Sequence, residues 1–183
     1  GSKLICVGKS PYTAEFDTMK LGEQEYFIKV SSDKVVLMGQ DENTDRDDGR
    51  DNNGITPSKD RLKVNYSQLV NDTASQIELV LPSVYDAQGT CYAVYDFLEK
   101  FVGVRFYGPH PMNVVVPQQT KLQLPVSEIR RTPDLKYRVG TYSFEWPMMK
   151  DQYFKPSGEM WQLFLRRIKF GGEKWAANHA FTS

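Results

Sequence analysis

The sequence predicts an α+β protein, with a domain of short strands around one helix followed by the start of a second domain. Three observations lead to this prediction. Two strand-like runs joined by a turn lie near the start of the chain, and one strong helix pattern lies near its middle. After a polar stretch at 127–133, a strand–helix–strand pattern begins, which is how a βαβ unit opens. We therefore place a linker and domain boundary at 127–133, with one domain over 3–126 and the next over 127–183.

The first three expected strands are apolar runs bounded by turn residues. Leu4–Val7 is closed by Gly8 and predicts a buried strand. Glu25–Val30 and Val35–Met38 are rich in β-forming residues. The Ser-Ser-Asp-Lys turn between them predicts that they pair as a hairpin.

A long acidic stretch follows the hairpin. Asp41–Gly54 holds six acidic residues, two arginines and no large apolar residue, so it predicts a solvated surface loop. A calcium loop of the EF-hand type is the alternative. Counted from Asp41, however, Arg46 stands where that loop needs glycine, and Asn52 stands where it needs glutamate. We therefore expect no metal here and no cofactor in the chain.

The clearest helix pattern covers 90–102. Thr90 is the expected N-cap and Gly103 the expected C-cap. Asp96, Glu99 and Lys100 are expected on the solvent side. The apolar stripe at helical spacing consists of Cys91, Val94, Tyr95, Leu98, Phe101 and Val102.

Shorter patterns complete the expected elements. In the first domain they are strands at 62–66, 77–81, 104–107, 113–116 and 121–124, with a rigid Gly-Pro-His-Pro turn at 108–111. In the second domain they are a strand at 135–142, an amphipathic helix at 160–170 and the approach to a strand at 176–181.

Composition excludes several functions. The 23 basic and 23 acidic residues balance, so nothing indicates nucleic-acid binding, and no apolar run approaches the length of a membrane helix. Cys6 and Cys91 are expected to be buried thiols, with a bond between them left open. Only two histidines occur, and His110 is expected to be an exposed turn residue. Phosphate-loop, dinucleotide, zinc-protease and serine-hydrolase motifs are absent from the sequence.

Several segments resemble a known kind of domain. The runs EYFIKV, VVLMG and GTCYAVYDFLE, at 25–30, 35–39 and 89–99, resemble the accessory N-terminal domain of β-hexosaminidases and α-glucuronidases. The runs VGVRFYGP and PDLKYR, at 102–109 and 133–138, look like a group of secreted bacterial proteins of the same build, the DUF4838 type. The resemblance implies a twisted, mostly antiparallel sheet with helices on one face. It also implies that 135–183 is the first strand–helix–strand of a truncated (β/α)8 barrel, and that a strand and helix normally precede Leu4.

The resemblance implies a function as well. The chain would be a non-catalytic domain plus barrel stub of a secreted or periplasmic glycoside hydrolase acting on polysaccharide or glycan. The two carboxylates that such hydrolysis needs would lie on later barrel strands, so no catalytic residue is expected in this chain. The missing catalytic domain would bind the carbohydrate, and the barrel stub would favour self-association of the chain.

Two residues are the expected substrate contacts in the complete enzyme. Arg138 would end the first barrel strand, and its guanidinium offers five fixed donors to sugar oxygens or a uronate. The alternative is that Arg138 pairs with a nearby carboxylate, Asp134 or Glu145. His179 is a candidate on the same geometry, near the end of the presumed second strand.

A different class of function stays open beside the first. The chain would then be a carbohydrate-binding or protein-interaction module with no enzymatic role. Trp146, Trp161 and Trp175 support it, because flat aromatic faces stack on sugars. Trp161 falls within the amphipathic helix, however, where core packing is the more usual role.

Overall fold

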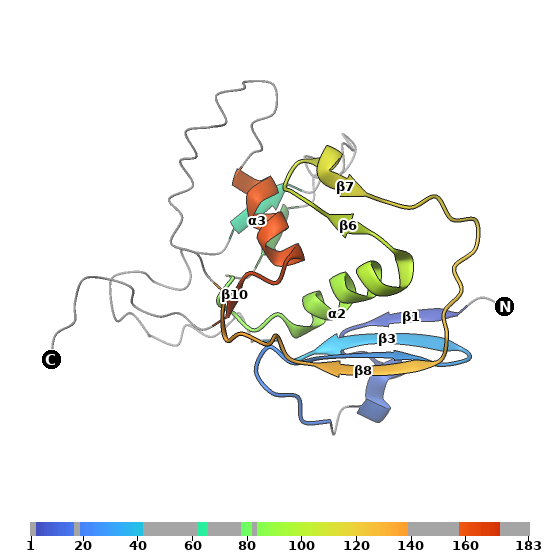
Figure 1. Cartoon of the computed structure of the whole chain (residues 1–183). Helices are drawn as coiled ribbons and strands as arrows, with labels where there is room; N and C mark the ends of the chain where they lie inside the picture. Colours follow the sequence, from blue (N-terminus) through green and yellow to red (C-terminus); the bar gives the residue numbers. More distant parts are fainter. Residues whose placement is uncertain are drawn as a thin grey trace, which may run out of the picture.

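A four-stranded sheet with one α-helix on its face forms the centre of the molecule. The computed structural model describes residues 3–16, 19–41, 62–65, 78–81, 84–138 and 158–172. The strand order is β1-β3-β2-β8; β1 runs parallel to β3, and β2 is antiparallel to both β3 and β8. The fold is therefore α+β with a mostly antiparallel sheet, as the sequence predicts (Figure 1). The elements are β1 (Leu4–Val7), β2 (Tyr26–Val30), β3 (Lys34–Gly39), β8 (Ser127–Arg131) and α2 (Gly89–Phe97).

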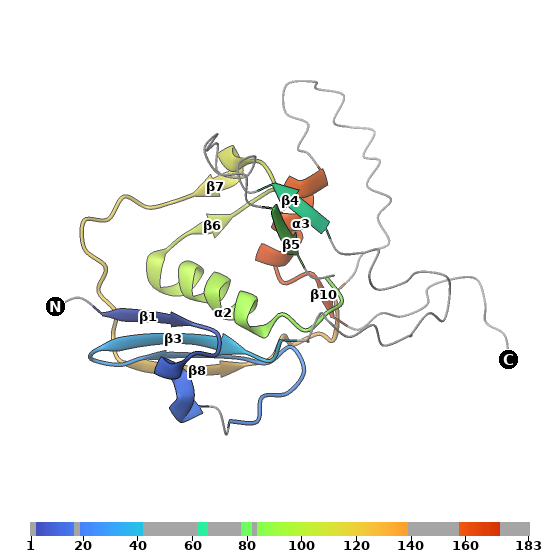
Figure 2. The ribbon, with the colours of Figure 1, turned by 180° about the vertical axis from the view of Figure 1, so that it is seen from behind.

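The sheet is covered on both faces, because alternate residues of its central strands point to opposite sides. On one side, β2 and β3 bury Tyr26, Ile28, Val30, Val35 and Leu37 against Tyr92, Ala93 and Phe97 of α2. On the other side, Cys6, Phe27, Val36 and Met38 pack around Phe16. Phe16 ends η1 (Pro11–Phe16), a short 3-10 helix on the face opposite α2 (Figures 1 and 2). The expectation of helices on one face only is therefore wrong.

β1 forms where the sequence predicts it but is not buried. It pairs only with β3, so its outer edge has no partner strand among the described residues. Cys6 is buried, whereas Ile5 and Val7 are each 54% exposed. A short apolar run does not distinguish a central strand from an edge strand.

The linker predicted at 127–133 is wrong for its first five residues. Ser127–Arg131 is β8, which pairs with all of β2 and places Ile129 opposite Ile28. Its charges are accommodated in ion pairs, Glu128 with Lys29 and Arg130 with Glu25. The boundary drawn at 127 therefore falls inside the sheet.

The predicted middle helix is present, but a different face of it is buried. α2 continues into η3 (Leu98–Val102), a π-helical turn, and Gly103 ends it with the expected left-handed φ of 81°. Tyr92, Ala93, Asp96 and Phe97 are the buried side chains along it, while the predicted stripe is half-buried. Asp96, expected in solvent, is only 5% exposed.

Two small hairpins lie beside α2 and beside α3 (Gly158–Arg167), the helix of the C-terminal part (Figure 2). β6 (Arg105–Phe106) pairs with β7 (Val114–Val115), and β4 (Leu62–Asn65) pairs with β5 (Glu78–Leu81), both antiparallel. The sequence predicts all four strands. The strand predicted at 121–124 is wrong, because these residues lie in an extended, mostly exposed connection without a ladder partner.

The C-terminal part contains α3 (Gly158–Arg167), within two residues of the predicted start of the helix. β9 (Tyr137–Arg138) pairs antiparallel with β10 (Gly171–Gly172). A Cβ on Gly171 would lie 1.7 Å from the Val84 carbonyl oxygen, and the φ of Gly171 is 118°. Only glycine therefore fits where β10 passes the backbone of Val84. The described residues form no barrel, and the strand expected at 176–181 lies outside them.

Candidate functional site

A pocket of about 310 Å³ lies between α3 and the connection from β6 through η4 (Pro111–Asn113) to β7. One wall comes from α3 and the other from the prolines and valines of that connection. Ligand pockets in proteins are mostly apolar with a few polar groups, and this volume is at their small end. The lining residues are Pro109, Pro111, Val114, Val116, Met160, Leu163 and Arg167.

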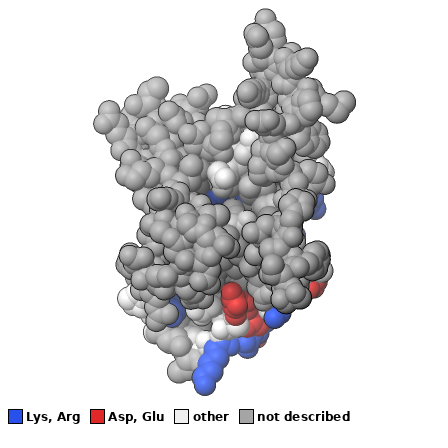
Figure 3. Space-filling view, turned by 90° about the vertical axis from the view of Figure 1, so that its left-hand side faces the viewer, with Lys and Arg blue, Asp and Glu red and all other residues white. Residues whose placement is uncertain are grey.

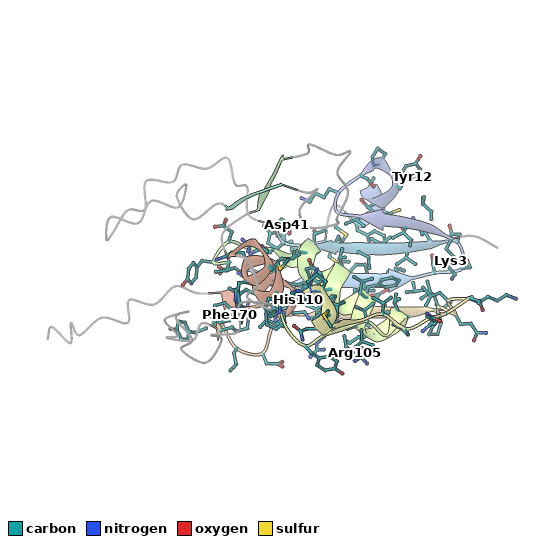
Figure 4. The ribbon with its side chains drawn as sticks, turned by 90° about the horizontal axis from the view of Figure 1, so that it is seen from above. Lys3, Tyr12, Asp41, Arg105, His110 and Phe170 are labelled. Carbon is teal, nitrogen blue, oxygen red and sulfur yellow. The ribbon has the colours of Figure 1, made fainter. Side chains whose placement is uncertain are left out.

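Helical spacing brings the α3 wall together. Met160, Leu163 and Arg167 stand at positions i, i+3 and i+7, and therefore share one side of the helix. The opposite wall is stiffened by its two prolines and by a turn in which Nδ1 of His110 accepts a hydrogen bond from the Met112 amide, 3.2 Å away. Figure 4 shows His110 beside α3.

Arg167 is the charged member of the lining, and aromatic side chains from two elements lie beside its guanidinium. The guanidinium carbon lies 5.0 Å from the ring centre of Phe106 in β6. Phe106 meets Tyr95 of α2 edge to face, with 5.6 Å between ring centres. Burial raises the pKa of Tyr95, and the positive charge of Arg167 partly offsets that effect. The Nε of Arg167 is buried without a hydrogen-bond partner.

No protein family, curated protein or solved structure matches the chain. The role of the pocket must therefore be inferred from its own residues.

The sequence reading missed Arg167. An Arg-Arg pair in the last turn of a helix usually complements the helix dipole in solvent. Here the first arginine, Arg166, is 2% exposed and donates to the backbone and side-chain oxygens of Gln162 at 2.7 and 3.1 Å. The sequence signal for Arg167 is its i+7 spacing from Met160, which places both residues on one side of α3. This spacing indicates a pocket only when the opposite wall is known.

Arg138 joins separate parts of the chain. Its Nε donates to the Lys169 carbonyl at 2.5 Å, and its Nη1 donates to the Leu135 carbonyl at 2.6 Å. Its Nη2 donates to Oε1 of Gln24 at 3.3 Å and to the Tyr92 hydroxyl at 3.4 Å. Among the described residues Arg138 does not pair with Asp134, because neutral oxygens accept its hydrogen bonds. Glu145, the other carboxylate considered, lies outside the described residues. His179, the second predicted contact, lies outside the described residues.

A buried polar group lies between the sheet and α2. The carboxylate oxygens of Asp96 lie 3.1 Å from Nζ of Lys100 and 3.6 Å from Nζ of Lys169, and its charge acts on the Tyr26 hydroxyl. Burial, and then the Asp96 charge, raise the pKa of Tyr26 well above its usual range. Both cations neutralise Asp96, so this group serves folding and has no free carboxylate to offer a substrate.

Other kinds of site find no support in the described part of the chain. It contains no cluster of histidine, cysteine and acidic residues that would hold a metal. Cys6 and Cys91 are both free thiols. None of the helices described could cross a membrane. On the face shown in Figure 3, described basic and acidic side chains lie next to one another at its lower end rather than forming a patch of one sign.

Proposed function

We propose that the chain is a non-catalytic accessory domain of a glycoside hydrolase-type protein. The observation that supports this proposal is the placement of the described carboxylates in the chain. Five described carboxylates pair with lysine or arginine, and none lines the pocket. Hydrolysis of a glycosidic bond needs two carboxyl groups facing each other across the bond, about 5–9.5 Å apart. The paired carboxylates are Glu15, Glu25, Asp96, Glu99 and Glu128.

The α+β architecture supports this proposal, since it agrees with the sheet and helix that the resemblance implies. The finer parts remain part of the proposal. They are a barrel start over 135–183, a secreted or periplasmic location, and self-association through the barrel stub. α3 follows β9 as a first barrel helix would, but the antiparallel contact of β9 with β10 is not one that neighbouring barrel strands make.

The direct test is turnover by the purified chain. A panel of aryl glycosides, including an aryl glucuronide and an aryl N-acetylglucosaminide, should show no release above that of a mock purification. Turnover that co-purifies with the chain and survives exchange of the expression host would overturn the non-catalytic role.

A glycan titration separates an accessory domain from a carbohydrate-binding module. Trp161 is half-buried and meets Phe164 edge to face, with 6.0 Å between ring centres, so it packs within the protein. Tryptophan fluorescence should therefore stay unchanged as neutral oligosaccharides are added, with Trp161→Phe as the control that assigns any signal. Saturable quenching that Trp161→Phe removes would favour the binding module.

A further inference from the structure

We propose that the pocket beside α3 binds a small organic carboxylate with an apolar body, and that Arg167 recognises the carboxylate. This inference does not depend on the accessory role proposed above. It rests on the charge at the pocket, on its walls and on how the cation is held.

The charge of Arg167 is not balanced within the described residues. Arg130 has Glu25, Arg105 donates to the carbonyls of Glu99 and Val104, and Arg138 donates to four oxygens. Arg167 instead lies over an aromatic ring, and its Nε is buried without a hydrogen-bond partner. A guanidinium retains its remaining donors in this position, and a carboxylate is the group that matches two of them at once.

The walls decide the rest of the ligand. Every lining residue apart from Arg167 is apolar, and two of them are prolines, which have no backbone N–H to donate. A neutral sugar would lose the hydration of its hydroxyls here without gaining partners from side chains. An aryl or branched alkyl group would bury apolar surface instead. The volume of about 310 Å³ suits one such group rather than a chain of sugars.

The cation is also prepared for binding. The guanidinium lies against Phe106 of β6, and Tyr95 of α2 packs edge to face on Phe106 and holds that ring in place. Because these contacts already restrict the side chain, less rotamer freedom is lost when a ligand binds.

The test compares two isosteric probes in the wild-type chain. Phenylacetate and phenylacetamide share shape and apolar surface but differ in charge. Calorimetric titration should show saturable binding of phenylacetate, at least about tenfold tighter than that of phenylacetamide. Equal affinity for both probes, or no binding of phenylacetate up to 10 mM, would overturn the proposal. This comparison needs no variant, so it holds even if a substitution disturbs folding.

Variants then assign the site. Arg167→Gln should weaken phenylacetate binding about tenfold or more and leave phenylacetamide binding unchanged. The matched control is Arg105→Gln, which removes an exposed cation from β6 next to Phe106 and should leave both affinities unchanged. Leu163→Trp should fill the pocket and abolish binding of both probes. If phenylacetate affinity survives both Arg167→Gln and Leu163→Trp, the ligand binds elsewhere and the assignment is wrong.

A third probe tests the apolar body. Glucuronate carries a carboxylate on a polar ring and should bind more weakly than phenylacetate. Glucuronate binding as tight as that of phenylacetate would overturn the inference that the walls select an apolar ligand.

Discussion

Gly39, the last residue of β3, and Gly89, the first residue of α2, touch backbone to backbone. A Cβ built on Gly39 would lie 2.1 Å from the Gly89 carbonyl carbon, and one built on Gly89 would lie 2.4 Å from the Glu25 carbonyl oxygen. The approach is secured by hydrogen bonds from the Gly39 amide to the Thr90 hydroxyl and from the Gly89 amide to the Gln40 carbonyl, each 3.0 Å long. This crossing fixes where α2 starts on the sheet.

Substitution at this crossing should be severe. Gly39→Ala should lower the free energy of unfolding by about 3 kcal/mol or more, because backbone rather than a flexible side chain must move. Urea unfolding measures the change. Gly22→Ala is the matched control, since its Cβ would meet only the Glu25 carboxylate at 3.5 Å. A change for Gly39→Ala no larger than that of the control would show that the two segments separate without cost.

Asp41 caps α2 from a distant part of the chain. Its Oδ1 accepts a 2.9 Å hydrogen bond from the Thr90 amide, and Figure 4 shows it beside the first turn. Asp41→Ala should cost about 0.5–2 kcal/mol of stability, as loss of a cap does, and Asp41→Asn should cost less because its amide oxygen can still accept. Thermal melting measures both. Asp134→Ala removes an exposed carboxylate and should have no effect; an equal loss there would point to general charge instead.

The cap and the helix show how far the sequence pattern reaches. The hairpin of β2 and β3 and the ends of the helix region are predicted, because local periodicity and turn residues determine them. Thr90 as N-cap is wrong, because Gln88 occupies the N-cap position without a side-chain hydrogen bond, and Thr90 lies inside α2. Its hydroxyl accepts from β3 while Asp41 supplies the cap. Local spacing does not reveal a partner 49 residues away.

Other errors have the same origin. The sequence of β8 predicts a linker because Glu128, Arg130 and Arg131 are charged. Only the pairing of β8 with β2 shows that Glu128 and Arg130 have partners of opposite charge. The helix pattern predicts a solvated Asp96, because the groups that interact with it lie in separate segments or in the next turn of the helix. These groups are Tyr26, Lys100 and Lys169. The candidate site is not predicted from the sequence for the same reason, since Phe106 and Arg167 come into contact only in the folded chain.

Cys91 should be a slow nucleophile in the folded protein. Burial raises the pKa of its thiol to about 11. At pH 8 a group with that pKa is ionised in roughly one molecule in a thousand, and the thiolate is the reactive form. In a Cys6→Ser variant, iodoacetamide should therefore label Cys91 far more slowly when the chain is folded than in urea. Equal rates would show that the thiol is accessible.

The same burial predicts loss of stability in alkali. Folding keeps the thiol of Cys91 and the phenol of Tyr26 protonated, since both pKa values are raised. The free energy of unfolding should thus fall as the pH rises above the ordinary thiol pKa of about 8.5, and continue to fall through about 11. Replacing Cys91 by alanine should flatten the first part of this decline in urea titrations at pH 8–11. An unchanged slope would assign the decline to other groups.

We expect Arg138 to stabilise the folded chain, whether or not it also contacts a substrate. Three of its hydrogen bonds connect β9 to the turn after α3, to α2 and to the segment before β2, and a fourth goes to the nearby Leu135 carbonyl. Arg138→Met keeps much of the side-chain length but leaves these oxygens without their donor, so it should lower the free energy of unfolding by about 2–4 kcal/mol. Arg131→Met is the matched control, because the side chain of this exposed arginine makes no hydrogen bond or ion pair with other described residues. It should change stability by less than about 0.5 kcal/mol. If Arg138→Met is as stable as the control, its contacts are not structural, and the substrate role expected from the sequence becomes the stronger explanation for this residue. If it is destabilised as predicted, any loss of activity in a longer protein must be measured at a temperature where the variant is fully folded.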